Sequence, residues 1–235
     1  IDMGTLTAGG TDWISNTITG IRVDCGSVSG ETFAIEAIYI GNGNYLANSC
    51  IDSGLNKING TVYSAVASKG LVNKGLYFNG VNSRVQLPNI ATLKPTNALT
   101  VSLWHKLDEV PTARRYLILS GRDVSSGYML YYNNSTTLSA KIWGSSGTTS
   151  CAYASTVGVW EHIVLTYDAV NGGGLWVNGT KVGTLVPKGA IVYPEMYNGA
   201  PSIGSHGDLY FYKGYIDEVR IYNRVLTPLE ISALY

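Results

Sequence analysis

The sequence predicts an all-β fold, a sandwich or barrel of short strands followed by one short C-terminal helix. Helical periodicity is nearly absent along the 235 residues, and short runs of β-branched and aromatic residues recur instead. Clusters of Gly, Asn, Ser, Asp and Pro separate these runs, as turns separate strands in sandwiches and barrels. The clearest hairpin spans residues 175–182, because Asn178-Gly179 between two strand-like runs suits a type I′ turn.

Residues 1–44 are expected to form a separate β-hairpin extension, or the last hairpin of a preceding domain. Residues 17–23 and 33–40 have the pattern of two strands, and the Gly-Asn-Gly-Asn of 41–44 breaks the chain before a main domain at 45–235. Two strands alone are marginal in water, so we expect this pair to dock on something. Because the sequence starts at Ile1, we also expect it to be processed or cut from a longer chain.

Within the main domain, strands are expected where apolar and aromatic residues gather between turn signals. Besides the 175–182 hairpin they are residues 75–78, 85–87, 99–107, 116–120, 128–132, 138–143, 160–167, 202–204 and 215–222. The helix is expected after Thr227, which supplies an N-cap hydroxyl. Pro228 takes the first helical position and Glu230 completes a capping box. We expect this helix to pack the C-terminus down.

Composition argues against several classes of partner. Only 14% of the residues are charged and the formal net charge is zero, so nothing indicates a nucleic-acid partner or a polybasic membrane anchor. No apolar run approaches the ~18 residues of a membrane-spanning helix, so no membrane insertion is expected. The cysteines, Cys25, Cys50 and Cys151, form no CxxC pair, so zinc is not expected. One disulfide and a free thiol could form, and their pairing stays open.

Six motifs, in order between about Asn48 and Tyr235, resemble the laminin-G-like branch of the concanavalin A-like lectin/glucanase superfamily. They lie at 52–63, 75–80, 99–104 (LTVSLW), 160–168 (WEHIVLTYD), 175–179 and 214–226 (GYIDEVRIYNRVL). The resemblance implies a two-sheet antiparallel jelly-roll sandwich with one concave and one convex sheet, in which the first and last strands are adjacent. The chain departs from the family at 45–50, where YLANSC replaces a first strand of the Trp-Phe type.

This fold hosts lectins, glycosidase accessory modules, adhesins and assembly domains, so the resemblance leaves the function open. We expect a non-catalytic extracellular recognition module, secreted or on a cell or virion surface, that binds a glycan or polysaccharide or acts in adhesion. The alternative is a structural or assembly domain of a virion, surface filament or cell envelope, with other subunits as partners and no glycan binding. The expected N-terminal hairpin and the low charge favour this alternative.

No catalytic site is expected. Glycosidases need two carboxylates about 5–6 Å apart on one sheet face, or further apart in inverting enzymes. The sequence lacks a Glu-x-Asp-x-x-Glu cluster that would place acids on one face of a strand. Adjacent pairs such as Asp217-Glu218 would point to opposite faces, and no Gly-x-Ser-x-Gly motif accompanies the three histidines.

Asp217 is the candidate metal ligand. Within 215–222 it is in phase with Val219 and Ile221, which predicts that it begins on the face that enters the core. An unpaired buried carboxylate is costly, and Ca²⁺ is one way to satisfy it. The resemblance places Asn79 nearby as a second oxygen donor. The alternative is a buried aspartate that accepts backbone N–H groups.

The candidate carbohydrate site lies on the polar faces of two strands. Trp104 is out of phase with the apolar set of 99–107, and Trp143 is out of phase with that of 138–143. An exposed indole suits the apolar C–H face of a sugar ring. Arg122, Tyr128 and Tyr131 are expected to form the rim. The alternative is that the N-terminal hairpin or a long loop covers the tryptophans.

The bias towards tyrosine, 17 against three phenylalanines, predicts many half-exposed aromatic side chains on sheet faces. Trp160 and His162 fall within the 160–168 family motif. We interpret them as structural, a packed tryptophan and a histidine whose hydrogen bonds go to the backbone.

Overall fold

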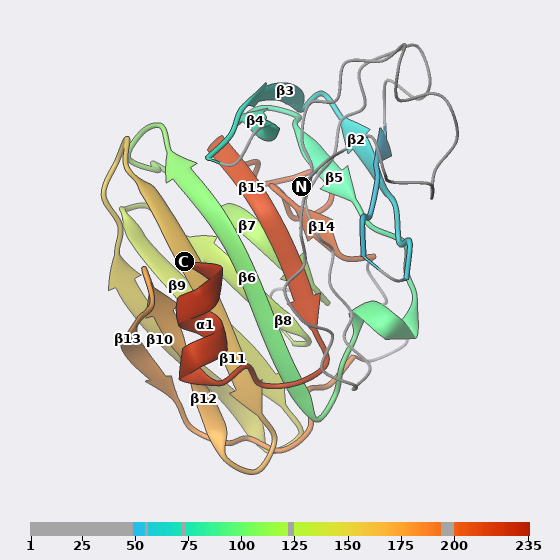
Figure 1. Ribbon diagram of the computed structural model, residues 1–235, viewed down its shortest axis with the longest axis vertical. Helices are drawn as coiled ribbons and strands as arrows, with labels where there is room; N and C mark the ends of the chain where they lie inside the picture. Colours follow the sequence, from blue (N-terminus) through green and yellow to red (C-terminus); the bar gives the residue numbers. More distant parts are fainter. Residues whose placement is uncertain (1–48, 55, 72–73, 122–124, 194–199) are drawn as a thin grey trace, which may run out of the picture. The chain divides into compact units, whose positions relative to one another are not determined.

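Two antiparallel sheets, one of eight strands and one of seven, make up the described part of the chain (Figure 1). The computed structural model describes residues 49–235 except 55, 72–73, 122–124 and 194–199, and all of these belong to one unit, Glu31–Tyr235. The hairpin expected within 1–44 lies outside the described residues. The two-sheet sandwich with a short C-terminal helix is confirmed.

The order of strands differs between the two sheets. The first sheet runs β1 (Ser49–Cys50), β2 (Gly60–Tyr63), β5 (Arg84–Gln86), β14 (Ser202–Ile203), β7 (Arg115–Ser120), β8 (Tyr128–Tyr132), β9 (Thr137–Gly144) and β10 (Gly147–Ala154). The second runs β13 (Thr180–Leu185), β12 (Gly172–Val177), β11 (Trp160–Asp168), β6 (Ala98–Leu107), β15 (Lys213–Tyr222), β4 (Lys74–Asn79) and β3 (Val66–Lys69). A 3₁₀ turn, Ala91–Leu93, precedes β6.

The last strand, β15, pairs with β4 and β6, whereas β1 pairs with β2 in the other sheet. The expected adjacency of first and last strands is therefore wrong for the described residues. Every strand predicted within the main domain is present, and β1, β2, β3 and β10 are additional strands. The strands predicted at 17–23 and 33–40 lie outside the described residues.

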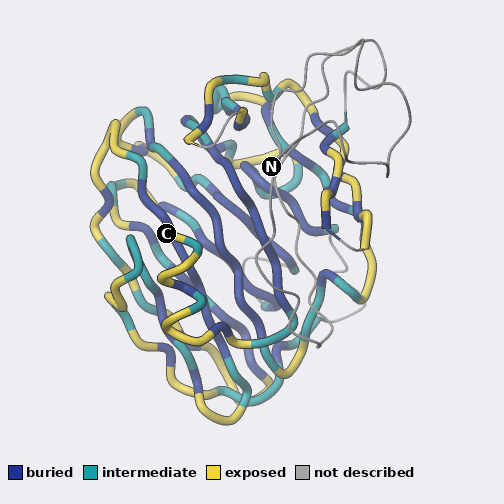
Figure 2. Tube along the Cα trace, viewed as in Figure 1, coloured by how far each residue is buried: buried dark blue, intermediate teal, exposed yellow. Residues whose placement is uncertain are grey.

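The core lies between the sheets and follows the predicted alternation. On β6 the four leucine and valine residues at 99, 101, 103 and 107 are at most 1% exposed and point inward. Figure 2 shows the buried trace running through the central strands of both layers, with exposure concentrated at the turns. Burying each such side chain is worth about 1.5–3 kcal/mol, so these central strands carry much of the stability.

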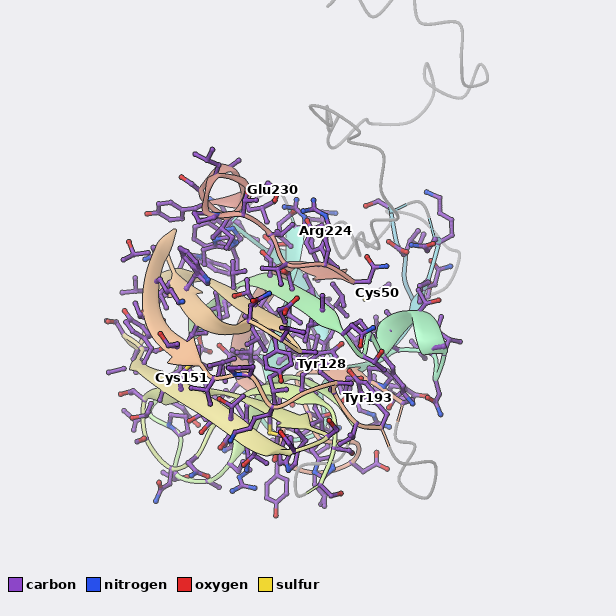
Figure 3. All side chains as sticks on the ribbon, turned by 90° about the horizontal axis from the view of Figure 1, so that it is seen from below. Cys50, Tyr128, Cys151, Tyr193, Arg224 and Glu230 are labelled. Carbon is purple, nitrogen blue, oxygen red and sulfur yellow. The ribbon has the colours of Figure 1, made fainter. Side chains whose placement is uncertain are left out.

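Helix α1 (Pro228–Leu234) begins with the predicted capping box. The Thr227 hydroxyl accepts the N–H of Glu230, and the Glu230 carboxylate accepts the N–H of Thr227. That carboxylate also pairs with Arg224 at 2.7 Å, and both side chains lie beside the helix in Figure 3. Ile231 is fully buried in a small cluster with residues of β11 and β15, so the helix docks on the outer face of the seven-stranded sheet.

Cys50 and Cys151 are free thiols, and Cys25 lies outside the described residues. Burial raises the pKa of the Cys50 thiol to about 12 and that of the Cys151 thiol to about 11. Both side chains therefore stay protonated at neutral pH. Among the described residues, no helix is long and apolar enough to cross a membrane.

Candidate functional site

The outer face of the eight-stranded sheet carries a group of contacting rings. Tyr116 and Tyr131 are direct cross-strand partners on β7 and β8, and their rings stack with centroids 5.7 Å apart. His206 lies 5.5 Å from Tyr116, and it stacks on Tyr210 at 6.2 Å with only 9° between the planes. The loop after β14 thus brings two rings onto a pair formed by neighbouring strands.

Two cations lie over rings of this face. The Lys141 ammonium is 4.3 Å from the Trp143 ring centroid, and the Arg114 guanidinium is 5.5 Å from that of Tyr131. Such cation–π contacts hold a charged donor beside an aromatic plane. We call the set Arg114, Tyr116, Tyr131, Lys141, Trp143, His206 and Tyr210 the Tyr131 surface.

Strand alternation places these side chains outward. On β8, Leu130 and Tyr132 enter the core, which leaves Tyr131 on the opposite face. On β9, residues 138, 140 and 142 enter the core, so Lys141 and Trp143 point outward as the sequence predicts. Cross-strand neighbours share a face, and the outward sets of β7, β8 and β9 therefore meet.

The members of the Tyr131 surface differ in exposure. Tyr116 is 0% and Trp143 6% exposed, because they pack with Met129 beneath the partly buried Val192. Tyr131 is partly exposed and Tyr210 is 44% exposed. The expectation of an openly exposed indole at Trp143 is therefore wrong, and the accessible ring edges belong to tyrosines.

Trp104 lies on the other sheet, away from Trp143. It is 8% exposed, because Tyr235 stacks over it with centroids 5.6 Å apart and His162 packs 5.0 Å away. The structure therefore does not join Trp104 and Trp143 in one site. Within the described residues, the cover on Trp104 comes from Tyr235, which follows α1.

The expected rim is not formed by Tyr128. This side chain is 0% exposed, in the core beside Leu130, and its hydroxyl donates to the Leu93 carbonyl at 3.3 Å (Figure 3). Tyr128 and Tyr131 are three residues apart, so strand alternation points them to opposite faces of β8. Burial raises the pKa of Tyr128. Arg122 lies outside the described residues.

The residues expected to hold calcium do not converge. Asp217 is 0% exposed at a bulge of β15, where its two oxygens accept the N–H groups of Leu71 and Glu218, each at 2.9 Å. The Asn79 side chain oxygen accepts N–H groups of its own turn, from Val81 at 2.8 Å. Asn79 pairs with the start of β15, whereas the Asp217 carboxylate lies against the backbone at Gly75, the other end of β4.

The bulge explains why the phase argument for Asp217 was wrong. Ile216, Val219 and Ile221 enter the core, whereas Asp217 is the cross-strand partner of Trp104 on the outer face. The carboxylate thus follows the alternative expectation, a buried aspartate that accepts backbone N–H groups. Among the residues that the structure describes, no three His, Cys, Asp or Glu side chains gather as a metal site. Calcium binding stays a prediction that this pair does not support.

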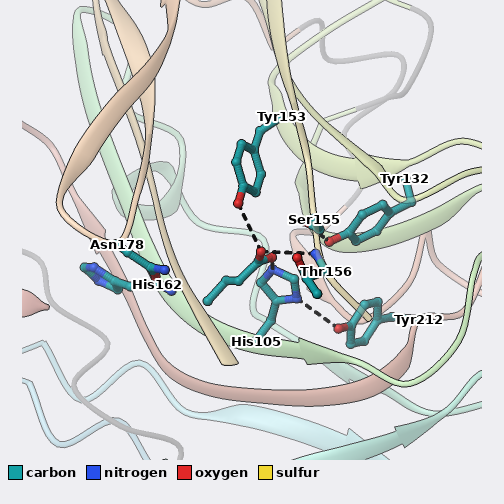
Figure 4. Close-up of polar contacts among 9 residues, drawn as sticks. His105, Tyr132, Tyr153, Ser155, Thr156, His162, Asn178 and Tyr212 are labelled. Atoms are coloured by element: carbon teal, nitrogen blue, oxygen red, sulfur yellow. Dashed lines mark hydrogen bonds and ion pairs between the residues drawn. The ribbon is translucent and has the colours of Figure 1, made fainter. Parts of the chain in front are cut away.

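The interior holds a polar network that the sequence reasoning missed (Figure 4). The imidazole of His105 contacts the Tyr212 hydroxyl at 3.1 Å and the Glu161 carboxylate at 3.4 Å. The same carboxylate accepts the N–H of Thr156 and the hydroxyl of Tyr153 at 3.1 and 3.3 Å. His105 shares the phase of the core leucines of β6, so its burial could have been predicted from periodicity.

Burial alone would raise the pKa of Glu161, but hydrogen bonds from His105, Ser155 and Thr156 outweigh it and leave the pKa below its ordinary value. His105 is 0% and Glu161 2% exposed. These two groups are closed off between the sheets and hold the layers together rather than face a ligand.

His162 is buried on the outer face beneath Tyr235. Its Nε2 lies 2.9 Å from the Ser102 hydroxyl, and its backbone N–H donates to the Asn178 side chain at 2.8 Å. The ring is therefore paired with a side chain, not with the backbone as expected. Burial lowers the pKa of His162 to about 4, so the imidazole is neutral at pH 7.

Comparisons with known proteins agree with this topology. Among solved structures, the binding domain of Paraclostridial Mosquitocidal Protein 1 is similar, with a TM-score of 0.68 and 15% identity over 86% of this chain and 51% of that one. Domain 4 of AbnA, an extracellular arabinanase from Geobacillus stearothermophilus, has a TM-score of 0.65 and 22% identity over 87% and 99%. The binding domain of botulinum neurotoxin serotype G has a TM-score of 0.65 and 14% identity over 86% and 50%.

The chain thus spans about half the length of the toxin binding domains and matches the arabinanase domain over nearly its whole length. At these identities the likeness shows the fold alone. No curated protein sequence matches the chain. A family model described as the concanavalin A-like lectin/glucanases superfamily, of the Laminin_G_3 type, matches residues 79–232. Since this match spans more than half of the sequence, the chain belongs to the concanavalin A-like lectin/glucanase superfamily.

Proposed function

We propose that the chain is a non-catalytic, extracellular carbohydrate-binding module whose ligand lies on the Tyr131 surface. The observation that carries the proposal is the partly exposed Tyr131 ring, which is stacked on the buried Tyr116 and flanked by the guanidinium of Arg114. An aromatic plane with hydrogen-bond donors at its edge matches a sugar, which offers an apolar C–H face and a rim of hydroxyl groups.

The surface is also preorganised. Tyr116, on the neighbouring strand, is fully buried and stacks against Tyr131, so the Tyr131 ring needs little ordering when a ligand binds. Arg114 is held by a hydrogen bond from its Nε to the Asn133 side chain at 3.1 Å. Lys141, over Trp143, brings a second flexible donor from the next strand.

The similar structures support a binding role. Domain 4 of AbnA was solved in complex with arabinotriose. Entry of botulinum neurotoxin type C into cells depends on interaction with two ganglioside molecules, and the binding domain of type DC was solved with SialylT. These ligands belong to those proteins, and for this chain they suggest the first glycans to try.

Replacing Tyr131 by Ala is expected to weaken glycan binding at least tenfold, about 1.4 kcal/mol, because the sugar loses its stacking plane. Tyr131→Phe keeps the ring and should keep most of the affinity. The measurement is retardation in native gels that contain linear arabinan, combined with an array of sialylated and neutral glycans.

Tyr63→Ala is the matched control, since Tyr63 is a 42% exposed tyrosine on strand β2 of the same sheet, outside the Tyr131 surface. Its binding should equal that of the unchanged protein. Equal binding by Tyr131→Ala and Tyr63→Ala would remove the Tyr131 surface as the site, and no binding by the unchanged protein would remove the glycan proposal.

A further inference from the structure

The outer face of the seven-stranded sheet is covered over one half and open over the other. Helix α1 and Tyr235 lie over the half that contains Ser102 and Trp104, which are buried. Two residues further along β6, Lys106 is partly exposed. The cover therefore ends between Trp104 and Lys106.

In that open half, four partly exposed side chains form a straight row across four adjacent strands. Trp160 of β11 is the cross-strand partner of Lys106, Lys106 is the partner of Tyr215 on β15, and Tyr215 is the partner of Tyr77 on β4. Direct partners share a face, and neighbouring strands lie about 4.8 Å apart, so the row is about 14 Å long. We call these four residues the cross-strand row.

The side chains of the cross-strand row contact one another. The rings of Tyr77 and Tyr215 have centroids 5.0 Å apart, and those of Trp160 and Tyr215 are 6.0 Å apart. The Lys106 ammonium lies 4.2 Å from the Tyr215 centroid and 5.7 Å from that of Trp160. Three rings and one amine thus make a continuous, partly exposed strip.

Polar groups of both signs border the strip. Asp108 forms a hydrogen bond with the Tyr77 hydroxyl and, with burial as the larger cause, raises the pKa of Tyr77. Next to it, Lys213 and Glu109 pair at 2.6 Å with side chains 36% and 47% exposed. The border therefore offers hydrogen-bond donors and acceptors, and its two acids are balanced by Lys213 together with Lys106 of the row.

We propose that the cross-strand row is a second carbohydrate-binding surface, which takes a neutral linear polysaccharide lying across the strands. The proposal goes beyond the Tyr131 surface, because its residues lie on the other sheet. Rings and an amine fit sugar C–H faces and hydroxyls. The charges of the row and its border balance, so they do not select for an acidic or basic chain.

The shape of the strip favours a polysaccharide over a protein partner. The aromatic row is narrow, because its inner neighbours on β6 and β15, Trp104 and Asp217, are buried and its outer border is polar. A stable protein interface takes about 800 Å² and some 20–30 residues from each side. A narrow strip that spans several strands instead matches an extended chain of sugars.

Trp160 was interpreted from the sequence as a packed structural residue. The structure places its ring in the strip, partly exposed and in contact with Lys106 and Tyr215. Strand phase alone could not reveal this, because the strip depends on which strands are neighbours.

The test separates the two surfaces by substituting each in turn. The probes are hydroxyethyl cellulose, glucomannan and linear arabinan, and the readout is retardation of the full chain in native gels. The variants are Tyr131→Ala, the double variant Trp160→Ala/Tyr215→Ala, and the combination of all three. Tyr77→Thr is a milder change of the strip in case the double variant fails to fold, and Tyr63→Thr is the control.

At least one of the three polysaccharides is expected to retard the Tyr131→Ala chain, and the strip substitutions should weaken that residual binding at least fivefold. Three results would overturn the proposal. Tyr131→Ala could abolish retardation by every polysaccharide, or the strip substitutions could leave the residual binding unchanged. The third is that none of the polysaccharides retards the unchanged protein. The Tyr131→Ala chain could also bind fully and lose that binding when the strip is substituted as well. That result would support the strip and remove the Tyr131 surface as a site.

Discussion

Replacing Glu161 by Ala is expected to lower the free energy of unfolding by about 1.5–3 kcal/mol, the range for hydrogen bonds to a charged group, because the buried imidazole of His105 loses its carboxylate acceptor. The change leaves the imidazole of His105, in the interior, without its carboxylate, and the N–H of the exposed Thr156 without its acceptor. Unfolding by urea, followed by tryptophan fluorescence, measures the loss.

Glu109→Ala is the matched control, because Glu109 also pairs with a basic side chain, Lys213, but at the surface. Its loss should be much smaller than that of Glu161→Ala, because solvent screens an exposed ion pair. Glu161→Gln should fall between the two, since an amide can still accept the Thr156 N–H. A loss below 1 kcal/mol for Glu161→Ala would contradict the role of the network in joining the sheets.

Lowering the pH from 7 to 5 is expected to destabilise the protein, with His162 contributing about 2 kcal/mol of the loss. The folded-state pKa of His162 is about 4, below the ordinary value of 6.5. Between these values the unfolded chain binds a proton that the native chain does not. Falling pH therefore favours unfolding, and the contribution is complete only below pH 4, where His162 is protonated in both states.

His162→Gln removes the titrating group, so the difference in stability between pH 7 and pH 5 should shrink by about 2 kcal/mol relative to the unchanged protein. The comparison uses the slope with pH, because the substitution also disturbs the contact with Ser102 and changes stability at every pH. An unchanged slope would show that His162 is accessible and titrates normally in the folded state.

Strand phase was a good guide wherever a strand is regular. On β6 and β9 the alternation correctly separated core residues from outward ones, and Lys141 and Trp143 were placed on the correct face. The capping box at Thr227 was also predictable, because all its parts lie within four residues. Local patterns of this kind need no knowledge of the rest of the chain.

Most of the wrong predictions about individual side chains depended on contacts between segments that are distant in the sequence. One inserted residue at the bulge of β15 reversed the side to which Asp217 points, and nothing in the local sequence marks it. Trp104 was expected to be open because its neighbours are polar, but Tyr235 covers it from 131 positions further along the chain. The edge strand β10 consists mainly of small and polar residues, most of them exposed, so its sequence resembled that of a loop.

The candidate site was predictable only in part for the same reason. Tyr131 and Trp143 were named from the sequence, yet Tyr116 and the loop residues His206 and Tyr210 join them through tertiary structure. Alternation shows which face of a strand a ring occupies. It cannot show which strands adjoin, and both aromatic surfaces depend on that neighbour order.

The most direct measurement is amide NMR chemical-shift mapping with the oligosaccharide of whichever glycan binds in the gel and array experiments. The account predicts shift changes that saturate with ligand and centre on Tyr131, Lys141 and Tyr210, across β8, β9 and the loop after β14. Changes confined to the turns that join the two sheets, with neither aromatic surface affected, would contradict it.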